Sequence, residues 1–339
     1  MAFPADMPDP AVTAAPQEVA PGIWRLVFPI NTFLKSVNAY LVSDGGGYAL
    51  VDCGMDTEEC WAELHAQLAA LNVPLHALHT IVATHGHPDH TGMADRIRRE
   101  TEVTVWLHAS EQAFIEYRRS DSSAELLERW LLRYGVPAEE AADMVSRVRD
   151  GDRATPAVTP THLFEGGEDL PVGDYTFEVH WTPGHTPGHV CLYEPARRML
   201  LCGDHILQEV APNVSLQPYT TENPMPGYLS SLQWMTDMPI ELTLPGHGLP
   251  FSDPRERVAA LIGHQIDRQA HVRSLLTRQP QTAYQLAEQV WADSKPHNWA
   301  EFHPRLRRNA MATLAAHLEL LADRGQAHRI DEEVVAYSR

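Results

Sequence analysis

The stretch Thr84-His85-Gly86-His87-Pro88-Asp89-His90 directly follows the apolar run Ile81-Val82-Ala83 and places four potential metal ligands within six residues. Side chains alternate across an extended backbone, so His85 and His87 are expected to point to the same side. Asp89 and His90 then fall on the following turn, where they can reach a second metal position. The string predicts a metal site; the alternative is a polar turn that happens to carry histidines.

Three later segments also place a histidine or an aspartate at the end of an apolar run. They are Trp181-Thr182-Pro183-Gly184-His185-Thr186, Leu200-Leu201-Cys202-Gly203-Asp204 and Leu244-Pro245-Gly246-His247-Gly248. The glycine before each ligand lets the backbone turn sharply at the end of a strand. Neutral imidazoles and carboxylates suit Zn, Mn or Fe(II), and five histidines with two aspartates are enough for two metal ions.

The composition is that of a soluble globular chain. It has 339 residues, of which 44% are hydrophobic and 21% charged, enough for one large and one smaller domain. No apolar run approaches the roughly 20 residues of a membrane span. Residues 1–18 read as a flexible leader without the basic start and apolar core of a signal peptide. Four cysteines without a C-x-x-C pair favour a reducing cytoplasm and make sulfur ligation unexpected.

Charge is distributed unevenly along the chain. The net charge is −19, but residues 251–339 carry 12 basic and 11 acidic residues, so the remainder sums to −20. An acidic catalytic region repels polyanions at long range, which argues against nucleic acid as the main substrate. It does not exclude a local basic groove.

The order of elements predicts an α+β fold. Strands are expected over residues 23–30, 37–43, 48–52, 80–84 and 103–107, and again between 176 and 244. A helical insertion occupies about residues 111–160, either as a packing layer or as a lid or wall of a substrate pocket. From about residue 251 the pattern changes to three helices, 255–278, 284–291 and 304–323, followed by a short strand pair.

Taken together, the four motifs resemble the metallo-β-lactamase-fold hydrolases, with the T-H-x-H-x-D-H signature, a later G-H-T, a G-D and a final P-G-H. The resemblance covers about residues 19–250 and implies an αββα sandwich with two metals at one edge of its sheets. It implies that His85, His87 and His185 hold the first metal and that Asp89, His90 and His247 hold the second. By the same resemblance Asp204 would bridge both.

Two further residues are expected to support the ligands rather than bind metal. Asp52, in the turn Val51-Asp52-Cys53-Gly54, matches the first motif of the family and would orient ligands by hydrogen bonds. His189, in the repeated Thr-Pro-Gly-His, is predicted to have a similar or a structural role.

Residues 251–339 resemble, more loosely, the winged-helix appendage of a subgroup of this family. That subgroup includes the human mitochondrial β-lactamase-like endoribonuclease and fungal acyl-carrier-protein thioesterases. The alternative is a packing or dimerisation module, which the near-neutral charge favours and which leaves a homo-oligomer possible.

The predicted reaction is hydrolysis of a small ester, thioester or lactone by a hydroxide shared between two divalent metals, most readily Zn, with Mn or Fe as alternatives. Asp89 would position the nucleophile. His205 could donate a proton to the leaving group, or be a packed histidine. Tyr219 and Tyr228 could contact the acyl substrate, or be packing residues. The sequence after Asp204 lacks the Gly-Cys-Gly-Arg stretch of glyoxalase II, which argues against glutathione thioesters.

Two other reactions of the same fold stay open. The first is a phosphodiesterase or endoribonuclease, which needs the same metals and a basic approach surface. The second is an enzyme similar to a persulfide dioxygenase, which needs a single iron. Metal content and a substrate panel discriminate between them.

Overall fold

Two β-sheets form the centre of the molecule. The computed structural model describes residues 15–154, 157–292 and 299–339. The first sheet has seven strands in sequence order, and the second has five in the order β12-β11-β10-β9-β8. The strands are β1 (Gln17–Ala20), β2 (Ile23–Pro29), β3 (Ser36–Ser43), β4 (Tyr48–Val51), β5 (Leu78–Val82), β6 (Thr104–His108), β7 (His162–Phe164), β8 (Asp169–Val172), β9 (Tyr175–Trp181), β10 (Val190–Glu194), β11 (Met199–Gly203) and β12 (Leu242–Pro245).

The sheets pack face to face, and their outer faces are covered by helices. On β3, Tyr40 and Val42 lie in the core between the sheets, whereas the alternate residue Leu41 lies in the core beneath the outer helices. Both faces of these strands are therefore buried, which explains their nearly continuous apolar runs. The predicted four-layer αββα arrangement is confirmed.

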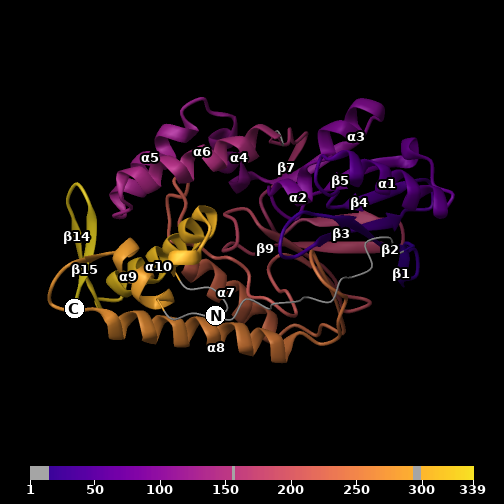
Figure 1. Cartoon of the computed structure of the whole chain (residues 1–339). Helices are drawn as coiled ribbons and strands as arrows, with labels where there is room; N and C mark the ends of the chain where they lie inside the picture. Colours follow the sequence, from indigo (N-terminus) through magenta and orange to yellow (C-terminus); the bar gives the residue numbers. More distant parts are fainter. Residues whose placement is uncertain (1–14, 155–156, 293–298) are drawn as a thin grey trace.

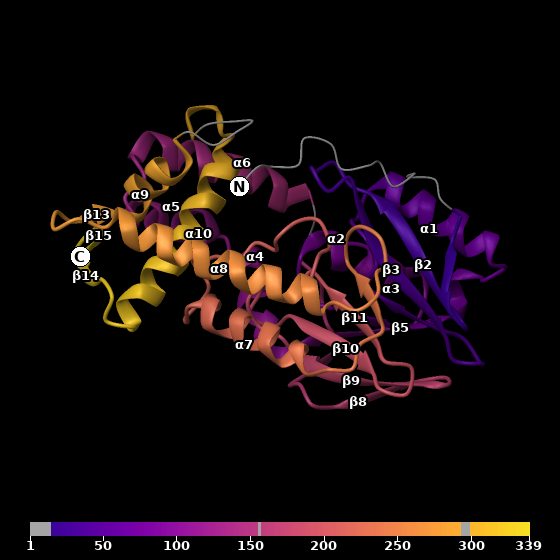
Figure 2. The same cartoon turned by 90° about the horizontal axis from the view of Figure 1, so that it is seen from below.

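Helices α1 (Glu58–Ala70) and α3 (Ala94–Glu100) cover the seven-stranded sheet. Helices α7 (Pro224–Thr236) and α8 (Arg255–Leu275) cover the five-stranded sheet, where they pack on Tyr193, Leu200 and Cys202. Viewed from below, α8 runs beside α7 along that side of the molecule (Figure 2). Short helical turns η1 (Leu75–Ala77) and α2 (Pro88–Thr91) complete this part of the chain.

The helical insertion and the C-terminal region form one helical unit. The insertion contains η2 (Ala109–Glu111), α4 (Gln112–Arg119), α5 (Ser123–Arg133) and α6 (Ala138–Ala154). The C-terminal region contains β13 (Gln281–Thr282), α9 (Ala283–Trp291), η3 (Trp299–Glu301), α10 (Pro304–Asp323), β14 (His328–Asp331) and β15 (Val335–Ser338). Figures 1 and 2 both place α5 and α6 beside α9 and α10.

Buried contacts and ion pairs join the two parts of this helical unit. Leu131 of α5 and Leu314 of α10 belong to one hydrophobic core, which also reaches the outer face of the five-stranded sheet. Glu140 of α6 accepts hydrogen bonds from Tyr284 Oη (2.7 Å) and Arg307 Nη1 (2.9 Å). The C-terminal region is thus packed onto the insertion over a shared core. Its three-stranded sheet has the order β13-β15-β14, and the winged-helix resemblance stays a prediction.

The predicted leader, residues 1–18, includes two residues that belong to a strand. Residues 1–14 lie outside the described residues, but Gln17 and Glu18 belong to β1, which pairs antiparallel with β2. Arg25 also donates to Gln17 Oε1 at 3.3 Å, so backbone pairing and a side-chain contact order this segment. Within the described ranges, no helix has the length and apolar character that crossing a membrane requires.

Candidate metal centre

The predicted ligands meet because six strands end at one edge of the two sheets. Strands β4, β5 and β6 run parallel, and so do β11 and β12; β9 shares the direction of β11, because both are antiparallel to β10. In the first sheet, Asp52 follows β4, His85 follows β5 and Glu111 follows β6. In the second sheet, His185 follows β9, Asp204 follows β11 and His247 follows β12. Loops at the carboxyl ends of parallel strands are a common position for binding sites.

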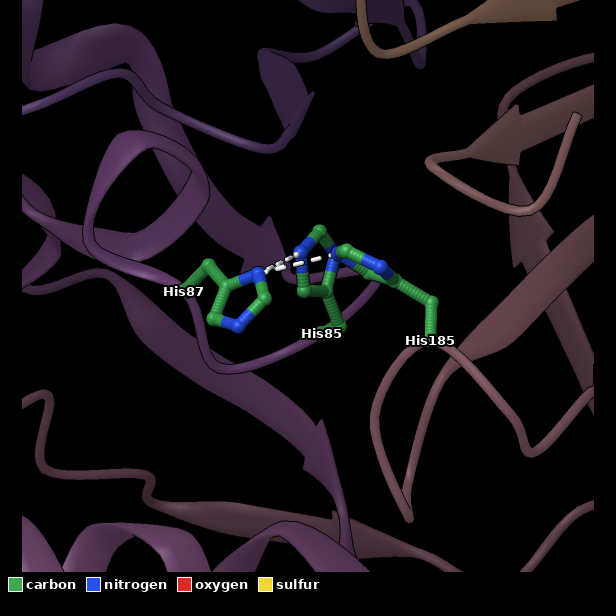
Figure 3. Close-up of side chains that lie close together, drawn as sticks. All are labelled: His85, His87 and His185. Carbon is green, nitrogen blue, oxygen red and sulfur yellow. Dashed lines mark hydrogen bonds between the residues drawn. The ribbon is translucent and has the colours of Figure 1, made fainter. Parts of the chain in front are cut away.

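The first group of ligand atoms consists of three imidazole nitrogens. His87 Nδ1 lies 2.9 Å from His85 Nε2 and 3.0 Å from His185 Nε2. Figure 3 shows the three rings converging from two segments that are distant in the sequence. Their ligand atoms are close enough together to hold one metal ion. Strand β5 ends at Val82, so His85 and His87 converge from a loop and not from the extended strand that the spacing suggested.

The second group contains Asp89, His90 and His247, whose ligand atoms also lie close together. Asp89 and His90 lie on α2, and His247 follows β12. His247 Nε2 is 3.5 Å from Asp89 Oδ2 and 3.4 Å from Asp204 Oδ2. The structure therefore brings the predicted second set together around one point.

Asp204 lies between the two groups. Its Oδ1 is 3.4 Å from His90 Nε2, and its Oδ2 is 3.5 Å from His185 Nε2. One carboxylate thus faces a histidine of each group, which is the position that a bridging ligand requires.

Hydrogen bonds fix which nitrogen of several histidines faces the centre. His90 Nδ1 lies 2.7 Å from Asp52 Oδ2, His247 Nδ1 lies 2.6 Å from the Ser36 carbonyl oxygen, and His185 Nδ1 lies 2.8 Å from the Asn213 carbonyl oxygen. Because these partners only accept, each Nδ1 carries a proton, and each Nε2 is the nitrogen that faces the centre. Three buried atoms lack a hydrogen-bond partner among the residues that the structure describes: His90 Nε2, His247 Nε2 and Asp204 Oδ1.

The electrostatics of the two groups differ. Burial lowers the pKa of His87 to about 3, so the first group consists of neutral imidazoles. Burial also opposes protonation of His247, but the neighbouring Asp204 and Asp89 carboxylates outweigh it and raise the pKa of His247 to about 10. The imidazoles of the second group thus take up protons to balance buried carboxylates. Imidazoles that draw protons toward buried carboxylates fit divalent cations, which would displace those protons and supply the positive charge instead.

Asp52 contacts both the signature segment and a ligand histidine. Its carboxylate accepts from Thr84 N at 2.8 Å and Thr84 Oγ1 at 2.9 Å, in addition to His90 Nδ1. His189 is fully buried; its Nε2 accepts from the backbone N–H of Asp204 at 3.1 Å, and its Nδ1 lies 2.9 Å from Thr182 Oγ1. Both residues therefore hold ligand-bearing backbone or rings in place.

The glycines before the ligands act in two different ways. Gly203 has a φ of +46° and Gly184 a φ of +147°, so the backbone before Asp204 and His185 adopts the conformation predicted for a sharp turn. Gly246 instead permits close packing, because a Cβ there would lie 2.6 Å from Asp204 Oδ1 and 2.7 Å from His90 Cε1.

An aromatic wall, formed by Phe114, Tyr117 and Tyr219, stands beside the first group. The Phe114 ring meets His87 edge-on at a centroid distance of 5.6 Å, and Tyr219 packs on Phe114 and on Tyr117, each at 5.1 Å. The predicted substrate contact Tyr219 is therefore one aromatic ring away from His87. This wall comes mainly from the helical insertion.

His205 and Tyr228 lie in the interior instead. Both side chains are fully buried, and their rings are 5.1 Å apart. Within the described ranges, neither the His205 nitrogens nor Tyr228 Oη has a hydrogen-bond partner. Tyr228 packs against Gly184 within the hydrophobic core. This placement agrees with the packing alternative for both residues and leaves them facing away from solvent.

Two residues with contacts to the ligand loops were missed at the level of sequence. Glu111 accepts hydrogen bonds from both Gly86 N and Gly188 N. Asn213 accepts from the ligand His185 through its carbonyl group and from Thr313 Oγ1 through its side chain (3.0 Å). Glu111 follows β6 at the same sheet edge as the ligands, a signal that could have identified it. Nothing in the spacing of Asn213 indicates its contact.

Comparison with known proteins agrees with this geometry. The sequence profile of the metallo-beta-lactamase superfamily matches residues 33–247. A metallo-beta-lactamase family protein from Thermus thermophilus has a solved structure that is 32% identical in sequence, with a TM-score of 0.82 over 95% of this chain and 100% of its own. A beta-lactamase domain protein from Burkholderia ambifaria is 27% identical, with a TM-score of 0.81 over 99% and 96% of the two chains.

Curated relatives give the same result. A probable metallo-hydrolase of Bacillus subtilis is 28% identical over 270 residues, covering 78% of this chain and 83% of the relative. A hydroxyacylglutathione hydrolase of Haemophilus influenzae is 25% identical over 183 residues (54% and 71%), and a thioesterase of Emericella nidulans is 20% identical over 249 residues (73% and 56%). With its profile match and its ligand groups, the chain belongs to the metallo-beta-lactamase superfamily, as one of its hydrolases.

Proposed function

We propose that this protein hydrolyses a small ester, thioester or lactone with two divalent ions, most readily Zn. The observation that carries the proposal is the position of Asp204 between two complete groups of ligand atoms. His85, His87 and His185 would hold one ion, and Asp89, His90 and His247 the other, while Asp204 would bridge them. Mn and Fe are alternatives that the same donor set accepts.

Two such ions would lower the pKa of water and polarise the oxygen of an acyl group. The chain's own residues prepare this chemistry. Burial opposes ionisation of Asp89, but His90 and His247 hold its pKa well below the usual range, so its carboxylate is ionised. An ionised Asp89 accepts a hydrogen bond from the attacking water and orients it toward the acyl carbon. Asp52 holds His90 in the tautomer that presents Nε2 to the centre.

The aromatic wall supports an acyl substrate. Phe114 lies directly beside His87, and Tyr219 extends this aromatic surface by one ring; the acyl chain would lie along it. The relatives described as a thioesterase and a hydroxyacylglutathione hydrolase favour thioesters among the candidate substrates. A net charge of −20 outside residues 251–339 opposes the approach of a polyanion such as RNA. The proposed partner is therefore a small acyl compound.

The test is a substrate panel assayed with the metal-loaded protein and with protein stripped by a chelator. The panel contains acyl thioesters, aryl esters, lactones, an aryl phosphodiester, single-stranded RNA and glutathione persulfide. We expect hydrolysis of an acyl substrate that is lost on stripping and restored by Zn²⁺, with two metal ions per chain.

A pair of histidine variants provides the control. His87→Ala removes a proposed first-group ligand and should abolish activity, whereas His65→Ala, which changes an exposed histidine that meets the Trp61 ring edge-on, should not. Full activity of the stripped protein or of His87→Ala would refute the metal-dependent reaction. Selective RNA or phosphodiester cleavage would replace it with the nuclease alternative, and one iron per chain with persulfide oxidation would replace it with the dioxygenase alternative.

A further inference from the structure

Glu111 is a buried carboxylate that touches the backbone of both loops of the first ligand group. It ends η2, directly after β6, and its side chain is fully buried. Glu111 Oε2 accepts from Gly86 N at 3.0 Å, and Oε1 accepts from Gly188 N at 2.7 Å. Gly86 lies between His85 and His87, whereas Gly188 lies three residues after His185. One side chain thus links loops that arise from two different sheets.

The two glycines are shaped to this carboxylate. A Cβ on Gly86 would lie 2.6 Å from Glu111 Oε2, and a Cβ on Gly188 would lie 2.7 Å from Glu111 Cγ. Real side chains do not approach so closely, so both loops need glycine for Glu111 to reach their N–H groups. The contact is therefore built from three positions that depend on one another.

The environment of Glu111 offers little other compensation for its charge. Burial raises the pKa of Glu111, against the opposing effects of the Thr186 hydroxyl and of the Gly188 and Gly86 N–H groups; across the part of the chain that the structure describes, no Lys or Arg forms an ion pair with it. Burying a carboxylate without a cation is costly, and a neutral residue of similar shape would cost the fold less. A carboxylate is suited here because both of its oxygens accept, whereas a glutamine offers one acceptor and one donor.

Glu111 also sets the position of the aromatic wall. Phe114 follows it by three residues on α4, and residues three apart lie on one face of a helix. The same segment therefore fastens the two ligand loops through Glu111 and places the Phe114 ring against His87.

We propose that Glu111 is a positioning residue that fixes the separation of the His85–His87 loop from the His185 loop, and so sets the affinity of the first group for its ion. This inference rests on the two-ion site of the proposed function. The distance that it controls is the 3.0 Å contact between His87 Nδ1 of one loop and His185 Nε2 of the other.

Zinc titration of the stripped full-length protein against a competing fluorescent chelator tests the proposal. For Glu111→Gln we expect the dissociation constant of one ion to rise about 10- to 100-fold, the usual cost of losing a group that orients metal ligands. The second ion should change by less than about 3-fold. Glu111→Asp keeps the charge with a shorter reach and should show an intermediate loss. Glu116→Gln removes an exposed carboxylate from the same helix and should match the wild type.

A cobalt titration separates a change in the metal site from a general loss of stability, because the Co²⁺ spectrum depends on the ligand geometry. The visible absorption of Co²⁺ in the first group should change in Glu111→Gln at saturating metal, while the unfolding temperature of the Co²⁺-loaded protein is measured in parallel. Wild-type zinc affinity and cobalt spectrum in Glu111→Gln would overturn the proposal; if that variant does not fold, the same result in Glu111→Asp would do so. If Glu111→Gln binds the first ion more weakly but the wild type hydrolyses no acyl substrate, the proposed function is refuted and the role of Glu111 is not.

Discussion

Replacing Asp52 by asparagine should weaken binding of the second ion without disturbing the backbone. Asp52 has a φ of +59°, a conformation that asparagine adopts more readily than most residues. The asparagine oxygen can keep the bond from Thr84 N, which is 2.8 Å from Asp52 Oδ1. In the wild type, Asp52 Oδ2 accepts from His90 Nδ1 at 2.7 Å. In the variant, the NH₂ group of the asparagine takes the place of Oδ2. Two donors face each other, so His90 loses the partner that holds its tautomer.

The size of the effect follows from that one contact. A hydrogen bond to a charged acceptor contributes about 1.5–3 kcal/mol. Since about 1.4 kcal/mol corresponds to a tenfold change in a dissociation constant, the second ion should bind about 10- to 100-fold more weakly. The first group is linked to Asp52 only indirectly among the described residues. Thr84 bonds Asp52, and its Oγ1 lies 3.1 Å from His85 Nδ1. The affinity of the first group should therefore change much less.

The assay is stepwise zinc binding to stripped protein, measured by chelator competition and checked by metal analysis. Circular dichroism and thermal unfolding establish that the variant is folded. Asp56→Asn is the matched control, because that carboxylate bonds Arg96 near the surface at 3.3 Å and touches no ligand. A change of less than about 3-fold in both dissociation constants of Asp52→Asn would refute the orienting role of Asp52.

Two further predictions concern the helical unit. Burial lowers the pKa of His317 to about 3 against an ordinary value near 6.5. The unfolded chain therefore binds this proton more readily, and stability is full above about pH 6.5 and declines as the pH falls toward 3. Relative to His317→Leu, the wild type should lose about 2 kcal/mol more unfolding free energy between pH 7.5 and pH 5.0, and parallel pH profiles in urea would contradict this. Thr313→Val removes the 3.0 Å hydrogen bond to Asn213, the residue whose carbonyl group accepts from His185. We expect the free energy of unfolding in urea to fall by about 0.5–1.5 kcal/mol, whereas Thr313→Ser should stay close to wild type. An equal loss in both variants would show that the hydroxyl is not responsible.

Much of the fold was predictable because it depends on local patterns. Apolar runs such as those of β3 and β5 mark buried strands, and the helical spacing of residues 126–134 marks an amphipathic helix that the structure shows as α5. Strand β1 was not predicted, since a strand at the edge of a sheet carries a weak pattern and depends on its neighbour for pairing. The packing of the insertion onto the C-terminal region was also missed, because their shared core joins residues far apart in the chain.

The sequence by itself determined which histidines and aspartates stand after apolar runs, and from them the ligand set could be predicted. His85, His185, Asp204 and His247 follow apolar strands, and the chemistry of histidine and aspartate restricts what such a set can bind. Only the tertiary structure decided which atoms face one another, since the tautomers depend on acceptors such as the Ser36 and Asn213 carbonyl groups.

The tertiary structure likewise separated Tyr219 from Tyr228. Both follow Asp204 in the same stretch of chain, yet Tyr219 packs on the aromatic wall while Tyr228 is fully buried in the core. The role of Glu111 likewise could not be predicted from the sequence, because its two partners come from loops of different sheets. Short-range patterns report which residues a segment contains, whereas a site is made by contacts between segments, and those exist only after the sheets have packed.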